Sequence, residues 1–284
     1  MQGSGSSIGE VARICGAKLE RGFWLPRRLP RAHVSESKNR AARAQVCLPQ
    51  RCKLYIAGAQ AAHVAEARAE APASAREVSF VHFGGACVIV QAQGYTLVFD
   101  PADHLSDSDI AALGGVVVTL FSNHLDDHFH GRTAMKLIDM KGSLVVGTEE
   151  VCKALASFAP STKLLELKPR RGFRAGPLRI FAVEGRHEVP TNLYYVTWGP
   201  SLLFAGDTGY VELAKLKAEL AFLPAGGSQY SKPEDSARMA VELGARYVVP
   251  VHCDESEAKR LAALLEGKAS VLVPALRTPY KLTL

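Results

Sequence analysis

Three apolar, β-branched runs in this chain each end close to side chains that can bind a metal ion. The runs are VVVTLF before Asp127 and His128, SLLFAG before Asp207, and YVVPV before His252. Such runs are typical of buried strands, and residues just beyond a strand end lie at the rim of a sheet, where functional sites are built. The sequence therefore predicts that two imidazoles and two carboxylates, remote in the chain, meet at one rim.

The residue types in this tetrad suit a divalent metal ion. Imidazole nitrogens and carboxylate oxygens are ligands of zinc, manganese and iron, and zinc is the ion that we favour. An ion held in this way keeps a position open for water and lowers the pKa of that water, which predicts a metal-dependent hydrolase. We expect Asp127, His128 and His252 to be ligands, and Asp207 to be a ligand that also orients the water. Asp100, before a proline, is expected to support the metal loops through hydrogen bonds.

The pattern of strands and helices predicts an α/β fold for residues 77–284. Short β-rich runs at 78–83, 86–91 and 95–99 are separated by glycines, as in a meander. Strands and helices then alternate, and the predicted helices include 133–140, 149–158, 211–219, 233–243 and 255–265. Strands that come first in a meander and later alternate with helices favour two sheets with helices outside, in one domain.

The N-terminal segment, residues 1–76, differs in composition from the rest of the chain. It carries 13 Lys and Arg against 5 Asp and Glu, whereas residues 77–284 carry 21 against 23. Its hydrophobic alternation is nearly absent, so we expect a basic, low-structure and largely disordered extension, which an over-long start of the coding frame would also explain. Alternatives are a basic arm that binds nucleic acid or membrane, or an Arg-rich transit-like leader.

Cysteine usage and hydropathy predict the compartment. The six cysteines form no CxxC pair, which favours reduced thiols and a cytoplasmic protein. No apolar run reaches the roughly 18 residues that a membrane helix needs, so no membrane partner is expected. The acidic balance of residues 77–284 argues against nucleic acid as a partner, since that binding usually draws on a basic stripe.

A series of short motifs carries a family resemblance. The motifs are Gly84-Gly-Ala-Cys-Val-Ile, Thr96-Leu-Val-Phe-Asp-Pro101, Ser122-Asn-His-Leu-Asp-Asp-His128, His187, Phe204-Ala-Gly-Asp-Thr-Gly209, Leu223-Pro-Ala-Gly-Gly227 and Val249-Pro-Val-His252. Their order and spacing over about residues 78–280 resemble the metallo-β-lactamase superfamily. Within it they are most similar to the branch of metal-dependent hydrolases that includes L-ascorbate-6-phosphate lactonase.

The resemblance implies a four-layer αββα sandwich with a metal site along one edge. The first motif of the family is His-x-His-x-Asp-His, and this chain has Asn123 and Leu125 where two histidines belong. In the family those histidines and a third, matching His187, hold one metal ion, and the tetrad holds the other. The tetrad is complete here, whereas the first site keeps only His187 and a share of Asp207.

This departure from the family motif leaves three alternatives open. The chain binds one ion in the tetrad, which we favour because four ligands remain. It binds two, if His124 or His130 shifts into place beside His187, since His124 and His128 would share a helix face if a helix began there. Or it is a metal-poor relative without catalysis. Metal content separates the three.

The sequence predicts hydrolysis of a small ester, lactone or phosphoester. Asp207 and His187 are the expected catalytic residues, because His187, released from metal binding, could donate a proton or hold an oxyanion. A small-molecule substrate is the expected partner, and a homo-oligomer is left open. Two rival functions remain: a non-catalytic binding or scaffold protein, and a phosphodiesterase or nuclease-like enzyme that holds its substrate with the basic arm.

Overall fold

The computed structural model describes residues 19–20 and 76–284 of the chain. The predictions made for residues 1–76 concern a segment that lies outside the described residues, apart from Arg76 and the short strand β1 (Leu19–Glu20). The helices and strands that position the candidate site all lie within residues 76–284.

Seven strands form one mixed sheet, in the spatial order β15-β2-β3-β4-β5-β6-β7. Their bounds are β2 (Glu77–Gly84), β3 (Cys87–Ala92), β4 (Tyr95–Phe99), β5 (Val116–Leu120), β6 (Leu144–Gly147), β7 (Leu164–Glu166) and β15 (Pro279–Thr283). Strands β2, β3 and β4 pair antiparallel, as the predicted meander requires. Strands β4 to β7 are parallel, so their carboxyl ends meet at one edge of the sheet.

Eight strands form the second sheet, in the order β1-β8-β9-β10-β11-β12-β13-β14. The remaining bounds are β8 (Gly172–Ala175), β9 (Leu178–Glu184), β10 (Asn192–Thr197), β11 (Ser201–Phe204), β12 (Leu220–Pro224), β13 (Tyr247–Val251) and β14 (Ser270–Val271). Strands β8 to β11 are antiparallel and β11 to β14 are parallel. Each sheet therefore has an antiparallel part and a parallel part.

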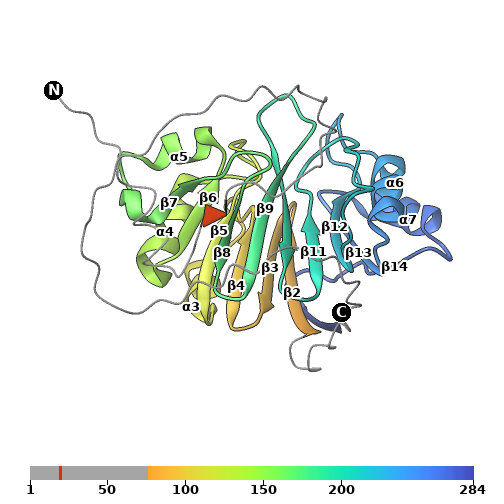
Figure 1. The fold of residues 1–284 in the computed structure, drawn as a ribbon, viewed down its shortest axis with the longest axis horizontal. Helices are drawn as coiled ribbons and strands as arrows, with labels where there is room; N and C mark the ends of the chain where they lie inside the picture. Colours follow the sequence, from red (N-terminus) through yellow and green to blue (C-terminus); the bar gives the residue numbers. More distant parts are fainter. Residues whose placement is uncertain (1–18, 21–75) are drawn as a thin grey trace, which may run out of the picture. The chain divides into compact units, whose positions relative to one another are not determined.

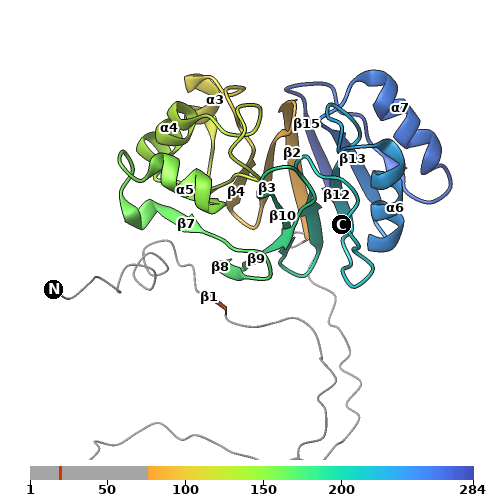
Figure 2. The ribbon, with the colours of Figure 1, turned by 90° about the horizontal axis from the view of Figure 1, so that it is seen from above.

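Helices cover the outer face of each sheet (Figures 1 and 2). Helices α3 (Asp107–Ala112), α4 (Gly131–Lys141) and α5 (Glu149–Leu155) lie beside the seven-stranded sheet, and α6 (Pro233–Leu243) and α7 (Glu255–Leu264) lie beside the other. A 3-10 turn, η1 (Ser161–Lys163), leads into β7. Within residues 76–284 every helix is too short or too polar to cross a bilayer.

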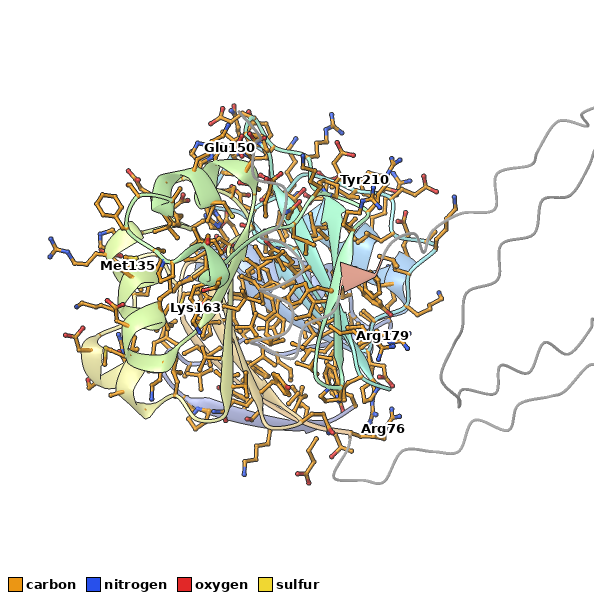
Figure 3. All side chains as sticks on the ribbon, turned by 60° about the vertical axis from the view of Figure 1, so that its left-hand side comes forward. Arg76, Met135, Glu150, Lys163, Arg179 and Tyr210 are labelled. Atoms are coloured by element: carbon orange, nitrogen blue, oxygen red, sulfur yellow. The ribbon has the colours of Figure 1, made fainter. Side chains whose placement is uncertain are left out.

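Four apolar clusters hold the layers together. The largest fills the space between the sheets, where side chains gather between the ribbons in Figure 3. Within this cluster Phe99 and Phe204 stack with ring centroids 4.4 Å apart. A second joins the eight-stranded sheet to α6 and α7, and two more lie against α3, α4 and α5. Burying one such aromatic side chain contributes about 1.5–3 kcal/mol. These layers confirm the predicted αββα sandwich.

Hydrogen bonds tie the segments after parallel strands β5 and β13 to antiparallel elements of the opposite sheet. The amide of His252, after β13, donates to the carbonyl of Gly85 at 2.8 Å, and the amide of Asn192 donates to the carbonyl of Ser122 at 2.8 Å. The Tyr194 hydroxyl adds a bond to the Phe121 carbonyl at 2.7 Å. Ligands of open α/β sheets bind at such carboxyl edges.

The helix predicted over 211–219 is wrong. This segment forms turns without a helix, although Leu213 and Leu216 are buried with the i, i+3 spacing of an amphipathic helix. The amide of Leu213 donates to the carboxylate of Glu242 in α6, and the amide of Ala218 donates to the end of that helix. Bonds to a neighbouring element thus replace the local bonds that helix propensity favours.

Candidate metal centre

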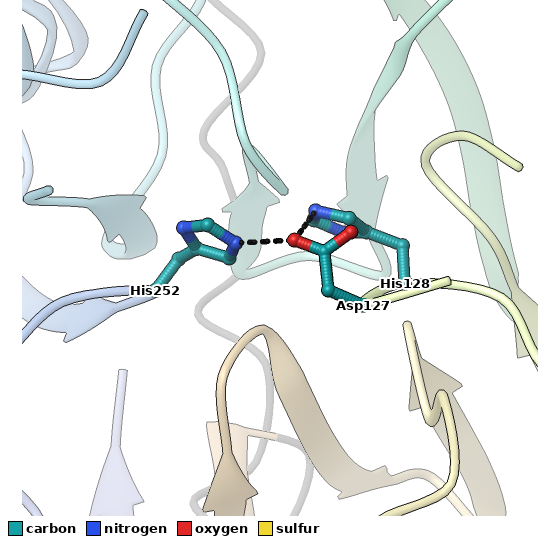
Figure 4. Close-up of side chains that lie close together, drawn as sticks. All are labelled: Asp127, His128 and His252. Carbon is teal, nitrogen blue, oxygen red and sulfur yellow. Dashed lines mark hydrogen bonds and ion pairs between the residues drawn. The ribbon is translucent and has the colours of Figure 1, made fainter. Parts of the chain in front are cut away.

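Asp127, His128 and His252 meet at this edge, although 125 positions separate Asp127 from His252 (Figure 4). Each offers one ligand atom, and these atoms all lie within 4.8 Å of one another. Asp127 Oδ2 lies 3.0 Å from His252 Nε2 and 3.6 Å from His128 Nε2. Three of the four residues of the predicted tetrad are therefore brought together.

His128 is fixed by a buried carboxylate behind it. Its Nδ1 lies 2.8 Å from Asp100 Oδ2, and Asp100 also accepts hydrogen bonds from the amide and the hydroxyl of Ser122, both at 2.6 Å. A carboxylate only accepts, so the His128 ring carries its hydrogen on Nδ1 and turns the lone pair of Nε2 toward Asp127. Asp100 thus supports the metal loop, as the sequence predicts.

The free nitrogen of His128 tests whether a metal ion fits this arrangement. His128 Nε2 is fully buried and has no hydrogen-bond partner, because Asp127 at 3.6 Å is too distant for a hydrogen bond. A buried polar atom without a partner costs about 1–3 kcal/mol. A cation shared with Asp127 and His252 would remove that cost, and two nitrogens with one oxygen suit zinc or a similar ion. The residues present therefore fit a metal ion.

His252 is held by two glycine-rich turns. Its Nδ1 lies 3.2 Å from the Gly226 carbonyl, which leaves Nε2 for Asp127. Its backbone has φ of 50°, in the left-handed region that non-glycine residues rarely adopt. A β-carbon on Gly227 would lie 2.4 Å from His252 Nδ1, so the ring occupies space that only glycine leaves free. Backbone strain of this kind clusters at functional sites.

Charge coupling shifts the pKa values of all three residues of the cluster. Burial lowers the pKa of His128, but the charge of Asp100 and the hydrogen bond to it outweigh burial and raise this pKa. The hydrogen bond from His252 lowers the pKa of Asp127 to about 2. Burial lowers the pKa of His252, but the hydrogen bond to Asp127 and the charge of Asp207 outweigh burial and raise this pKa to about 9. Without metal, the pair is therefore an ion pair at neutral pH.

Asp207 lies outside the three-residue cluster and forms a second group with His187. Asp207 Oδ2 lies 3.2 Å from His187 Nε2, and both side chains are 3 % exposed. Its other oxygen accepts hydrogen bonds from Ser228, at 2.9 Å, and from Ser231. The Tyr230 ring packs against His187, with centroids 4.4 Å apart. Both oxygens of Asp207 are thus occupied by protein groups.

The alternative ligands His124 and His130 lie in a turn and not on a helix. Residues 124–128 form bends and turns, and α4 begins only at Gly131. His130 Nδ1 bonds Thr133 Oγ1 at 3.0 Å in the first turn of α4, whereas His124 Nδ1 is buried without a partner. The shared helix face on which the two-metal alternative depended is absent from this segment.

Sequence reasoning missed the two serines that hold Asp207. Ser228 and Ser231 lie in the loop that follows β12, at the same carboxyl edge as the tetrad. Their position after a buried strand was the available signal, but serine is common in loops and carries little information alone. Cys253, beside His252, is a free thiol outside the cluster, and burial raises its pKa to about 11.

Comparison with known families agrees with the fold. Residues 79–252 match the family described as the β-lactamase superfamily domain, and the chain belongs to this family. At the level of class, it is a metal-dependent hydrolase of the metallo-β-lactamase superfamily.

Curated relatives carry the same class name. A UPF0173 metal-dependent hydrolase of Geobacillus thermodenitrificans is 28 % identical over 191 residues, covering 60 % of this chain and 83 % of the relative. A protein of the same name from Lysinibacillus sphaericus is 25 % identical over 196 residues, covering 62 % and 84 %.

Solved structures share the fold. Igni18, a metallo hydrolase of the archaeon Ignicoccus hospitalis, is similar with a TM-score of 0.63 and 17 % identity, covering 72 % of this chain and 98 % of that one. The metallo-β-lactamase fold protein YhfI of Bacillus subtilis gives a TM-score of 0.55 and 15 % identity, with coverage of 72 % and 99 %.

Proposed function

We propose that this chain hydrolyses a small ester, lactone or phosphoester with one divalent metal ion, most suitably zinc, held by Asp127, His128 and His252. The observation that carries the proposal is the buried, unpartnered Nε2 of His128, which faces a carboxylate and a second imidazole. Three protein ligands with an open fourth position are typical of catalytic rather than structural zinc sites.

The bound ion would supply Lewis-acid polarisation of the substrate and lower the pKa of water. Asp127 faces the approach to the site, because its side chain is 58 % exposed while His128 is fully buried. Asp100 holds His128 in the tautomer that presents a lone pair, which is the usual role of a carboxylate behind a ligating histidine.

His187 and Asp207 form the proposed proton-transfer pair. Asp207 is fixed by two serine hydroxyls and accepts from His187 Nε2, so the proton of this ring has a defined position. A histidine side chain can act as a general acid and deliver a proton to a leaving group. The metal-ligand role predicted for Asp207 stays a prediction: Oδ2 accepts only the bond from His187, and a carboxylate oxygen has a second lone pair for a cation.

The proposed substrate is a small molecule. Residues 77–284 carry 21 basic against 23 acidic side chains, which gives no support for a nucleic acid substrate. The lactone and phosphoester classes rest on the resemblance of the motifs to the lactonase branch. A cytoplasmic location, inferred from the cysteine pattern, belongs to the same proposal.

The test combines metal content with a substrate screen on the purified full chain. After loading with zinc, manganese or iron, we expect about one ion per chain, together with hydrolysis of a nitrophenyl ester, a simple lactone or bis-nitrophenyl phosphate. No bound ion would overturn the proposal in favour of a metal-poor binding protein. Two ions would instead support a rebuilt first site.

Two substitutions test the proton-transfer pair. Asp207→Ala and His187→Ala are each expected to lower kcat by about 100- to 10,000-fold, the usual contribution of general acid–base catalysis. An undiminished rate in Asp207→Ala, or an unchanged rate and pH profile in His187→Ala, would remove that residue from the mechanism.

A further inference from the structure

Buried polar atoms without a hydrogen-bond partner are confined to two segments of the described part of the chain. Five side-chain atoms are buried and unpaired there: Asn123 Nδ2, His124 Nδ1, His128 Nε2, Thr148 Oγ1 and Glu150 Oε2. All five belong to the segments that follow β5 and β6, two neighbouring parallel strands. Buried unpaired groups are rare in folded proteins and call for an explanation. A metal ion explains His128 but not Asn123.

The orientation of the Asn123 side chain is fixed by the loop itself. Its Oδ1 accepts a hydrogen bond from the amide of Leu125 at 2.9 Å, which is an Asx-turn. Exchanging the oxygen and the nitrogen would set an NH₂ group against that amide, so the assignment of the two atoms follows from the contact. The NH₂ group therefore points away from the loop, and Asn123 is fully buried.

Ser122, the residue directly before Asn123, contacts both halves of the site. Ser122, the preceding residue, lies within 3.3 Å of His128 Nδ1. The same serine packs against Gly206, where an added β-carbon would lie 2.7 Å from it, and Asp207 follows Gly206. Asn123 therefore follows Ser122, the residue through which the loop after β5 contacts the loop that carries Gly206 and Asp207.

The chemistry of an amide NH₂ group selects its partner. It donates hydrogen bonds and has no lone pair to offer a cation, so a metal ion cannot satisfy it. A substrate oxygen that gains negative charge during hydrolysis can accept its hydrogen bond. Preorganised amide donors commonly stabilise such an oxygen in hydrolases. We propose that Asn123 Nδ2 binds a carbonyl or phosphoryl oxygen of the substrate. This inference rests on the proposed function and adds a catalytic residue to it.

The substitution of histidine by asparagine at this position then has a defined effect. The family motif has a metal ligand here, whereas this chain has a neutral hydrogen-bond donor at the same position of the sequence. The position changes from holding a second ion to holding substrate, which agrees with a site for one ion.

The experiment uses two variants that both keep an acceptor for the Leu125 amide. Asn123→Ser is neutral and can form the equivalent turn with its hydroxyl, and Asn123→Asp has the same shape as asparagine but no donor. The probe is inorganic phosphate, titrated calorimetrically into the full chain loaded with zinc. Both variants are expected to keep the wild-type metal content and to bind phosphate at least about 10-fold more weakly, because a hydrogen bond to a charged group is lost.

Kinetics on the ester found by the substrate screen give the second readout. Loss of one oxyanion donor is expected to lower kcat about 100-fold with little change in KM. The matched control is Asn192→Asp, since Asn192 is also buried but its NH₂ group already donates to the Leu167 carbonyl at 2.7 Å. This control is expected to lower the melting temperature and to leave phosphate affinity within about twofold.

Three outcomes would overturn the inference. Wild-type phosphate affinity and kcat in both Asn123 variants would exclude a donor role. Weaker phosphate binding in Asn123→Asp alone would show charge repulsion instead of a lost donor. Absence of phosphate binding to the zinc-loaded wild type would show that the proposed binding site for a substrate oxygen does not exist.

A wild type that binds zinc and phosphate but hydrolyses no ester would instead refute the proposed function. The phosphate titrations would still decide the role of Asn123.

Discussion

The two acid–histidine groups at this edge use the same residue types but differ in their surroundings. In the Asp127 group, His128 Nε2 has no partner and the carboxylate is 58 % exposed. In the Asp207 group, two serine hydroxyls and an imidazole occupy both carboxylate oxygens, and the side chain is 3 % exposed. Unfilled bonding capacity, more than residue type, therefore distinguishes a candidate ligand from a group that is already satisfied.

The largest expected effect is loss of metal on removing a ligand. His252→Ala is expected to weaken zinc binding by more than about 100-fold, because losing even an outer support of a ligand costs about 10- to 100-fold. Metal content after dialysis measures the effect. His130→Ala, which changes a histidine of the metal loop bonded to Thr133, is the control and should keep wild-type content. A His252→Ala protein with a full equivalent of zinc would break the comparison.

The converse substitution tests the satisfied group. His187→Ala is expected to retain zinc affinity within about threefold, since His187 contacts Asp207 and lies outside the three-residue cluster. Competition with a chelating dye measures this affinity. A large loss of zinc would mean that His187 and Asp207 take part in metal binding, as they do in the two-metal alternative.

Alanine substitutions at two glycines test whether the turn at Gly227 positions the His252 ring. Gly227 and Gly94 have nearly the same backbone, with φ of 78° and 79°, but a β-carbon would meet His252 only at Gly227. Gly227→Ala is expected to displace the ring and weaken zinc binding by about 10-fold or more. Gly94→Ala carries only the backbone strain, about 1–2 kcal/mol of stability. Equal zinc affinities in the two variants would contradict the argument.

A smaller effect is expected for the serines of the Asp207 group. Ser231→Ala removes a donor to a buried carboxylate, and a hydrogen bond to a charged group contributes about 1.5–3 kcal/mol. Urea unfolding of the metal-free protein measures the loss. Ser256→Ala, whose hydroxyl bonds the exposed Asp254 side chain, should change stability by less than about 0.5 kcal/mol. Equal effects would mean that Asp207 does not depend on its serines.

The smallest expected effect is the release of a proton when zinc binds. The pKa of His252 is about 9 without metal, so this ring is charged at pH 7, whereas metal binds neutral imidazole. The pKa of Asp127 is about 2, so its carboxylate has no proton to lose. Zinc uptake at pH 7 should therefore release about one proton from this pair, and affinity should rise with pH until about 9. Calorimetry in buffers of different ionisation enthalpy measures the release, and uptake without proton release would contradict the assignment.

The fold and three of the tetrad residues could be predicted from sequence because both depend on local patterns. Buried β-branched runs mark strands, and residues shortly after such runs lie at the rim. Asp127, His128 and His252 could therefore be expected at the same rim. The register of neighbouring parallel strands then aligns those rims.

The surroundings of Asp207 could not be predicted, because they depend on contacts between loops. Nothing in the spacing of Ser228 and Ser231 shows that both hydroxyls turn toward one carboxylate. The helix prediction for 211–219 failed for a related reason. The Leu213 amide, which a helix would have used, donates instead to the Glu242 carboxylate in α6. The unpaired state of Asn123 likewise depends on three-dimensional burial, to which sequence patterns are insensitive.

The candidate ligands come from opposite sheets, since Asp127 and His128 follow β5 and His252 follows β13. An ion bound by all three residues would link the two sheets of the sandwich at this edge. Binding only the native state stabilises it by about 2.7 kcal/mol at a free ion concentration 100 times the dissociation constant. Metal supply would then set the lifetime of the protein as well as its activity. Chelation should first expose to hydrogen exchange the amides of His252 and Asn192, which donate to the carbonyls of Gly85 and Ser122.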